Sequence, residues 1–208
     1  MKRFSNLIAL ASVALSMTLT AGVARAADKK ADLAAGEAKA TTVCGACHTF
    51  DGSRGMPTYP ILQGQHPEYI VKQLTEFKEG KRKNAIMGGM AAALTPEDMK
   101  NVAAFYGSKK GLTGAAKNKE LVAAGERIYR GGIAKKAVAA CAGCHSPNGA
   151  GLPAQYPRLA GQHADYIKAQ LTSFRQGERT NSAQMSAIAA NLSDKEIDAL
   201  SDYIAGLR

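Results

Sequence analysis

Apolar residues in this chain recur at intervals of three and four positions, which is the spacing of one face of an α-helix. The clearest example begins at Pro67, whose fixed backbone angle suits a first helical turn, and it ends at Gly80. Its apolar positions are Tyr69, Ile70, Leu74 and Phe77. No stretch alternates apolar and polar residues for long enough to predict a strand. The pattern therefore predicts an all-α fold.

Two further helices are predicted in the first half of the chain. One covers residues 32–47 and is rich in alanine, and the other begins near Thr95 and Pro96. The apolar positions of the latter are Met99, Val102, Phe105 and Tyr106. In the second half, residues 193–196 (Ser-Asp-Lys-Glu) have the form of a capping box and start a matching helix. Each half should thus contain about three main helices with long loops between them.

The second half of the chain repeats the first. Residues 59–66 (Tyr-Pro-Ile-Leu-Gln-Gly-Gln-His) return as residues 156–163 (Tyr-Pro-Arg-Leu-Ala-Gly-Gln-His), at a constant offset of 97. After Asn84 and Asn181 the second copy has one extra residue, and the offset becomes 98. This internal duplication predicts two tandem domains, residues 27–107 and 118–208, joined by a linker at residues 108–117.

A Cys-x-x-Cys-His pentapeptide occurs in each copy, at residues 44–48 and 141–145. Together the pentapeptides contain every cysteine of the protein, namely Cys44, Cys47, Cys141 and Cys144. This is the attachment sequence of c-type haem: two thiols three residues apart reach two vinyl groups of the porphyrin, and the adjacent histidine reaches the iron. We therefore expect two covalently bound haem c groups per chain, with His48 and His145 as proximal iron ligands.

Other uses of four cysteines are less consistent with the pattern. Disulfides would not require a histidine directly after each pair. An all-thiolate zinc site would have to close across 93 intervening residues, far more than the usual 15–20. A thioredoxin-like couple would be expected in a βαβ setting, which neither pair has.

The second axial ligand of each iron can be sought with the offset of the duplication. The candidates outside the leader are Met56, Met87, Met90, Met99 and Met185, together with His66 and His163. Among the first-half methionines only Met87 maps onto another methionine, Met185, and we predict these two as ligands; Met90 and Met99 are interpreted as core residues. His66 and His163 also map onto each other, so ligation by two histidines stays as an alternative. Their place at the start of a helix favours a capping role.

The N-terminus reads as a secretory signal, with a charged start, a short apolar run and a small-x-small site that predicts cleavage near Ala26. The mature protein should then be periplasmic. The formal charge of the chain is +10, of which three basic residues lie in residues 1–26. The remaining excess suits an acidic protein partner or an anionic membrane surface. The lysines form scattered short clusters such as residues 81–83, interpreted as solvated helix ends and loops, which argues against nucleic acid.

With its two pentapeptides, its paired Tyr-Pro-x-Leu-x-Gly-Gln-His stretches and its paired methionines, the chain resembles tandem class I cytochromes c of the dihaem cytochrome c4 family. The resemblance covers residues 27–208. It implies His/Met ligation, two haems facing each other across the domain interface, and carbonyl groups of Pro60 and Pro157 that accept hydrogen bonds from the proximal histidines. It also implies electron transfer between a quinol-oxidising complex and a terminal oxidase, often with loose attachment to the membrane.

A carrier of this kind needs no small-molecule substrate and no acid–base pair, so we expect a protein that is not an enzyme. Two alternatives remain at this stage. A dihaem peroxidase would need one iron with an open sixth position, against which the paired methionines argue. A haem-bearing subunit of a periplasmic dehydrogenase would have the same sequence features as a free carrier.

Overall fold

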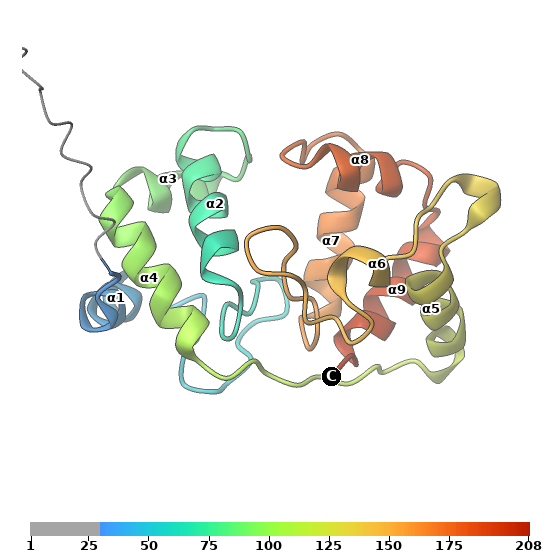
Figure 1. The fold of residues 1–208 in the computed structure, drawn as a ribbon, viewed down its shortest axis with the longest axis horizontal. Coiled ribbons are helices and arrows are strands. Elements are labelled where there is room, and N and C mark those ends of the chain that lie inside the picture. The colour runs from blue at the N-terminus through green and yellow to red at the C-terminus, as the bar shows by residue number, and fades with distance from the viewer. Residues whose placement is uncertain (1–29) are drawn as a thin grey trace, which may run out of the picture. The chain divides into compact units, whose positions relative to one another are not determined.

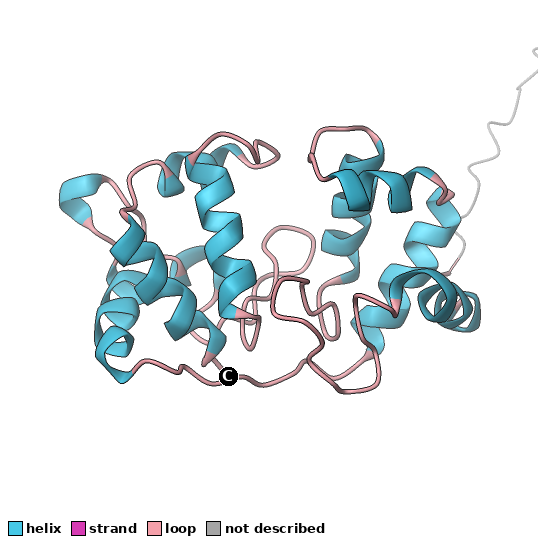
Figure 2. Ribbon diagram, turned by 180° about the vertical axis from the view of Figure 1, so that it is seen from behind, coloured by secondary structure: helices cyan, strands magenta, loops and turns pink. Residues whose placement is uncertain are grey.

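The computed structural model describes residues 30–208, and its regular structure is helical (Figures 1 and 2). The proposed signal peptide, residues 1–26, lies outside the described residues. The first half contains α1 (Leu33–Lys39), the π-helical turn η1 (Ala40–Cys44), α2 (Pro67–Lys78), α3 (Ala85–Ala92) and α4 (Pro96–Ser108). The second contains α5 (Lys119–Gly131), the 3₁₀ turn η2 (Ala134–Lys136), α6 (Ala142–His145), α7 (Ala164–Arg175), α8 (Ala183–Ala189) and α9 (Asp194–Ala205).

The all-α prediction is confirmed within the described part of the chain, where only two isolated antiparallel bridges occur and no strand forms. The helix predicted over residues 32–47 differs in detail, since it changes to a π-turn at Ala40. In that turn the Gly45 amide donates to the Ala40 carbonyl at 2.7 Å. The hydroxyl groups of Thr41 and Thr42 bond back to carbonyls of the preceding turn, which loosens regular α-helical bonding just before the cysteines.

Each half contains, before its last helix, a short helix that the sequence pattern did not indicate. Helices α3 and α8 are short, and each is started by a side-chain cap: Asn84 accepts from the Met87 amide at 2.9 Å, and Ser182 accepts from the Met185 amide at 3.3 Å. The helices that follow, α4 and α9, both begin with a capping box, at Thr95 and at Ser193. The second box was predicted, and it is confirmed.

Each half has its own apolar core, and in each half the first and last helices cross in direct contact. Glycine makes each crossing close. A Cβ added to Gly36 of α1 would lie 2.2 Å from the Asn101 carbonyl oxygen of α4, and one added to Gly125 of α5 would lie 2.2 Å from the Ala199 carbonyl oxygen of α9. Only a residue without a side chain permits this approach.

The chain between α4 and α5 has no regular secondary structure and runs along one side of both halves (Figures 1 and 2). It is tied down at its end, where the amides of Lys117 and Asn118 both donate to the Asp202 carboxylate, at 2.8 and 3.1 Å. Residues 31–208 thus form one unit. Among the described residues, no helix is both long and apolar enough to cross a membrane.

Candidate haem sites

In both halves the backbone folds the two cysteines and the histidine of the pentapeptide into one helical turn. The Cys47 and His48 amides donate to the Cys44 carbonyl at 3.1 and 2.8 Å. The second copy repeats this geometry, at 3.2 and 2.8 Å, with the carbonyl of Cys141 as acceptor. None of the four cysteines is in a disulfide, and all are half-buried. The turn therefore presents two free thiols and an imidazole from one short segment.

Burial raises the pKa of the Cys44 thiol to about 11, partly offset by the nearby Lys39 cation, and burial likewise raises the pKa of the Cys141 thiol to about 11. The leading cysteine of each pair is thus a neutral, poorly hydrated thiol. The two pairs lie in different halves, and no cluster of three or more His, Cys, Asp or Glu among residues 30–208 is arranged to hold a metal ion. The all-thiolate zinc alternative therefore lacks its ligand set there.

The two histidines are held in the same way. Nδ1 of His48 lies 2.9 Å from the Pro60 carbonyl oxygen, and Nδ1 of His145 lies 3.0 Å from the Pro157 carbonyl oxygen. Both rings are buried, and burial lowers the pKa of each imidazole more than its carbonyl partner raises it. A neutral ring that donates from Nδ1 has its lone pair on Nε2, which is the atom needed to bind a metal. These carbonyl contacts are the ones that the family resemblance implied.

The candidate methionines differ in their surroundings. Met87 and Met185 each occupy the third position of a short helix, α3 or α8, and pack partly buried against the core of their own half. Met99 is 3% exposed and is a core residue, as predicted. Met90 is 45% exposed, so the interpretation of that residue as core was wrong. Met56 is 58% exposed and lies outside both cores.

His66 and His163 stand at the N-cap positions of α2 and α7, but neither side chain makes a capping bond. Nε2 of His66 lies 2.9 Å from the Ala150 carbonyl oxygen, and Nε2 of His163 lies 2.6 Å from the Arg54 carbonyl oxygen. Both contacts join one half of the molecule to the other. The capping role predicted for these side chains is therefore wrong; they fasten the interface, which also occupies the ring nitrogen that bis-histidine ligation would use.

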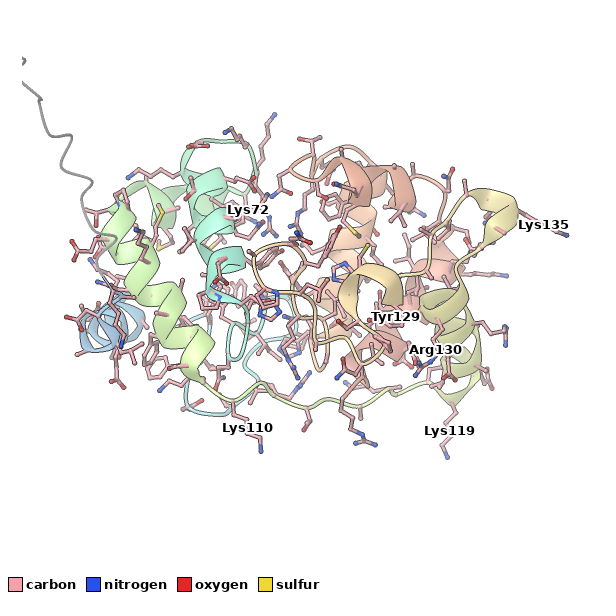
Figure 3. The ribbon with its side chains drawn as sticks, viewed as in Figure 1. Lys72, Lys110, Lys119, Tyr129, Arg130 and Lys135 are labelled. Carbon is pink, nitrogen blue, oxygen red and sulfur yellow. The ribbon has the colours of Figure 1, made fainter. Side chains whose placement is uncertain are left out.

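A buried tyrosine supports the pentapeptide of each half. The Tyr106 hydroxyl donates to the His48 carbonyl oxygen at 2.6 Å, and the Tyr129 hydroxyl donates to the Ser146 carbonyl oxygen at 2.7 Å. Both side chains are completely buried. Figure 3 labels Tyr129 beside α6, the helix that contains His145. Each tyrosine thus fixes the backbone at the point where the pentapeptide ends.

Two buried arginines lie where α2 and α7 face each other across the interface. Arg82 donates to Gln73 at 2.8 Å in its own half, and to Tyr166 and Gln170 of the other half at 3.0 and 2.8 Å. Each of Arg82 and Arg179 is 8% exposed, so Arg82 is not part of a solvated loop, which corrects the interpretation of residues 81–83.

Arg179 makes the reciprocal contacts, with Gln170 at 2.7 Å in its own half and with Tyr69 and Gln73 of the first half at 3.1 Å each. Burial would lower the pKa of the Arg82 guanidinium, but nearby phenol and carboxylate groups outweigh it and raise that pKa. Two positive charges are thus buried together, with amide and phenol oxygens as their hydrogen-bond acceptors. A buried pair of positive charges favours an anionic group beside it. The 97-residue offset between the two arginines was the sequence signal that could have drawn attention to them.

Comparison with known proteins agrees with this picture. The family model described as cytochrome c matches residues 33–108 and again residues 122–208. Cytochrome c4 of Pseudomonas aeruginosa is 46% identical over 197 residues, which span 93% of this chain and 97% of that protein. The thiosulfate dehydrogenase electron acceptor of Stutzerimonas stutzeri is 37% identical, over 97% of this chain and 94% of that protein.

A crystal structure of reduced recombinant cytochrome c4 from Pseudomonas stutzeri has a TM-score of 0.80 and 43% identity, covering 86% of this chain and all of that one. The fold and the two equivalent sites define a c-type cytochrome with two covalently bound haems, one in each half. The chain belongs to the cytochrome c family, as a tandem protein of the cytochrome c4 type.

The residues of the two sites are suited to hold a covalently bound haem. The free thiols and the histidine of each pentapeptide suit covalent attachment and iron ligation, and the partly buried thioethers of α3 and α8 are the soft ligands that a haem iron accepts. Haem also carries two carboxylates, for which the buried Arg82 and Arg179 are suitable partners.

Proposed function

We propose that this protein is a periplasmic electron carrier whose two haem irons are each ligated by one histidine and one methionine. The proposal rests on one observation: the same pair of candidate iron ligands, a histidine and a methionine, occurs in both halves. His48 with Met87 in the first half, and His145 with Met185 in the second, occupy equivalent places in the two copies.

Each residue has a definite part in this proposal. Cys44 and Cys47, and likewise Cys141 and Cys144, would hold the haem by thioether bonds. The imidazole Nε2 and the thioether sulfur would complete the coordination of the iron, which when bound supplies a one-electron redox couple. The Pro60 and Pro157 carbonyls keep the Nδ1 proton in place and so orient each ring. The apolar cores exclude water, which limits reorganisation on electron transfer.

The buried arginines complete the proposed site. Arg82 and Arg179 would provide charge-assisted hydrogen bonds to haem carboxylates at the interface, with Tyr69 and Tyr166 beside them. Burial would raise the pKa of the Tyr166 phenol, but the two guanidinium groups outweigh it and lower that pKa. This environment is strongly positive without a bound anion, and the carboxylates would offset it.

We propose redox proteins as the partners, and no small-molecule substrate. A terminal oxidase and a quinol-oxidising complex are the partners implied by the resemblance to the cytochrome c4 family. A dehydrogenase is suggested by the relative named as a thiosulfate dehydrogenase electron acceptor. Lysines such as Lys110, Lys119 and Lys135 project from the surface in Figure 3 and suit an acidic partner or an anionic membrane surface. Electron transfer to an acidic partner should therefore slow as salt concentration rises; a flat salt profile would contradict charge steering.

The ligand assignment is tested by Met87→Ala and Met185→Ala, with Met90→Ala as the matched control. Met90 lies on the same helix as Met87 but is exposed. Each ligand variant should lose about half of the long-wavelength sulfur-to-iron band of the oxidised protein, the double variant should lose all of it, and the control should keep it. Unchanged spectra in the double variant would overturn His/Met ligation.

The carrier role and the location need separate tests. Rapid peroxide turnover, or carbon monoxide binding to the reduced protein at neutral pH, would favour the peroxidase alternative, since both need an open iron position.

Cell fractionation should find the haem-containing protein in the periplasm and without residues 1–26. Haem protein retained in the cytoplasm with an intact N-terminus would contradict the proposed location.

A further inference from the structure

Two glutamines, one from each half, insert their amide groups against the backbone of the opposite half. Oε1 of Gln162 accepts from the Ile61 amide at 2.9 Å, and its Nε2 donates to the Ile61 carbonyl at 3.0 Å. Gln65 does the same to Arg158, accepting from its amide at 2.8 Å and donating to its carbonyl at 2.9 Å. The contacts are reciprocal, because the 97-residue offset relates Gln65 to Gln162 and Ile61 to Arg158.

The backbone partners directly follow the two prolines that hold the histidines. The peptide unit between Pro60 and Ile61 therefore has both of its polar groups in use. Its carbonyl accepts from His48 Nδ1, and its N–H donates to Gln162 of the other half. In the second half the corresponding peptide accepts from His145 and donates to Gln65.

Hydrogen bonds on the two sides of one peptide strengthen each other, because the amide is a single resonant unit. Donation from the N–H places more negative charge on the carbonyl oxygen, which then accepts more strongly from imidazole Nδ1. A stronger bond at Nδ1 makes Nε2 a more basic ligand. A more basic ligand stabilises the ferric state over the ferrous state.

The surroundings preserve this effect. Gln65 and Gln162 are 7% and 8% exposed, and they border a cavity of only about 10 Å³ together with Ile61 and Arg158. So small a space holds at most about one water molecule, so the hydrogen bonds are not weakened by exchange with bulk solvent. Each glutamine Oε1 also accepts from the backbone N–H of the following residue, His66 or His163, at 3.0 Å. This bond fixes the orientation of the side-chain amide.

We propose that Gln65 and Gln162 are positioning residues that act on the axial histidine of the opposite half, so that each domain lowers the reduction potential of the haem in the other. The proposal rests on the proposed function, in which His48 and His145 are iron ligands. It gives the interface a role in tuning the two redox centres in addition to holding the halves together.

The test substitutes methionine, which is similar in length but makes no such hydrogen bonds, in the protein that carries both haems. Gln162→Met should raise the potential of the first-half haem, so that its ferrous-to-ferric ratio at a fixed applied potential rises about threefold. Gln65→Met should do the same to the second-half haem. NMR signals of the Met87 and Met185 methyl groups assign each midpoint to its half.

Gln63→Met is the matched control. Gln63 is 4% exposed and lines the same cavity, and it also makes two backbone hydrogen bonds, at 3.0 and 3.1 Å. Those bonds go to Gly52 and Ser53 of its own half and do not reach a peptide that holds a histidine. This control should leave both potentials unchanged. Equal shifts in Gln63→Met and Gln162→Met, or a shift confined to the half that contains the substitution, would overturn the relay.

A second measurement separates the relay from simple loosening of the interface. In the ferrous protein the His48 Nδ1 proton should move upfield in Gln162→Met, and Gln162→Glu, which keeps an oxygen acceptor for the Ile61 amide, should restore it. A glutamate variant that behaves like the methionine variant would contradict the proposal.

The same spectra test the ligand assignment independently. Iron-bound imidazole has ring protons shifted strongly by the haem ring current. If these shifts are missing from the unsubstituted protein, the proposed function fails; if they are present while the opposite-half potentials do not respond, the relay alone fails.

Discussion

The two halves of the molecule support the same carbonyl region with tyrosines from different helices. In the first half Tyr106 comes from the last helix, α4, and in the second half Tyr129 comes from the first helix, α5. The equivalent of Tyr106 is the smaller Ile204, and the position corresponding to Tyr129 is the smaller Ala40. Each copy therefore has a buried hydroxyl donor at the end of its pentapeptide, on carbonyls one residue apart in the two copies, and either of two crossing helices can supply it.

The two halves also differ by one extra residue, which the second copy has after Asn181. In the first half Asn84 caps α3. In the second half the extra residue lets Ser182 cap α8, and the equivalent asparagine, Asn181, is released to the interface. There its Nδ2 donates to Gln73 at 3.0 Å and to Glu76 at 2.6 Å, both on α2 of the first half. One copy therefore uses asparagine for local structure and the other uses it for assembly.

The largest difference we expect concerns the glycine crossings. Gly125→Ala and Gly36→Ala should each destabilise the protein by about 3 kcal/mol, because the new methyl group would overlap a carbonyl oxygen of the opposing helix. Gly125→Ala should cost more, since its Cβ would also lie 2.6 Å from Tyr203 Cβ, whereas the Gly36 Cβ would lie 3.0 Å from Phe105 Cβ. Denaturant unfolding of the protein with both haems measures this; Gly131→Ala, where an added Cβ meets nothing, is the control. Equal stability of all three variants would contradict the tight crossing.

The two tyrosines should be equally important despite their different helices. Tyr106→Phe and Tyr129→Phe each leave a carbonyl near the pentapeptide without its buried donor, which should cost about 1.5 kcal/mol of unfolding free energy. Tyr59→Phe, for a half-buried tyrosine without such a bond to the pentapeptide backbone, should be close to neutral. A large effect at only one of the two buried positions would show that the halves are not equivalent at this point.

Elements with strong local signals could be predicted from the sequence. Pro67 marks the start of α2, and the serine and glutamate of residues 193–196 mark the start of α9, because a cap acts on amides only a few residues away. The short helix α3 gave no such signal: Ala85–Ala92 is apolar all around and contains two glycines, which weaken any helical preference. Its start depends on the Asn84 cap and on packing against α2.

The interface could not be predicted from the same local signals. Arg82, Gln65 and His66 are polar residues in segments that resemble ordinary loops and helix ends. The burial of Arg82 and Gln65, and the contact that His66 makes with the other half, depend on how the two copies meet. The offset did show that each has a polar equivalent in the other copy. It did not show that the equivalents contact each other's half, because the offset carries no information about the arrangement of the copies in space.

Capping variants should separate the local role of asparagine from its role in assembly. Asn84→Ala and Ser182→Ala should each cost about 1 kcal/mol of unfolding free energy, through loss of the first turn of α3 or α8. Asn181→Ala should leave α8 intact and instead increase amide exchange at the interface around Gln73. Exchange measured by NMR or mass spectrometry distinguishes these results. If Asn181→Ala frays α8 as Ser182→Ala does, the assigned division of roles is wrong.

The smallest expected effect concerns the lysines that contact the two capping boxes. Lys39 of α1 lies 3.2 Å from the Asp98 carboxylate, whereas Lys136 of η2 contacts both Glu196 oxygens, at 2.9 and 2.8 Å. Lys136 lies between Tyr129 and Cys141, in a segment eight residues longer than the corresponding one between Ala40 and Cys44. Lys136→Ala should lower the free energy of unfolding by about 0.5 kcal/mol, a small effect because both ion pairs lie near solvent. Lys39→Ala should lower it less, because Lys39 makes one longer contact and Lys136 makes two.

This contrast should depend on pH in a definite direction. Burial would raise the pKa of Glu196, but hydrogen bonds from Lys136 and Ser193 outweigh it and lower that pKa below its ordinary value of 4.5. A carboxyl pKa that is lower in the folded protein stabilises the fold above the unfolded value, and this contribution is lost as pH falls through the folded value. The difference between the wild type and Lys136→Ala should therefore be present at pH 7 and shrink below about pH 4.5. A difference that persists in acid would show that Lys136 acts through packing and not through its charge.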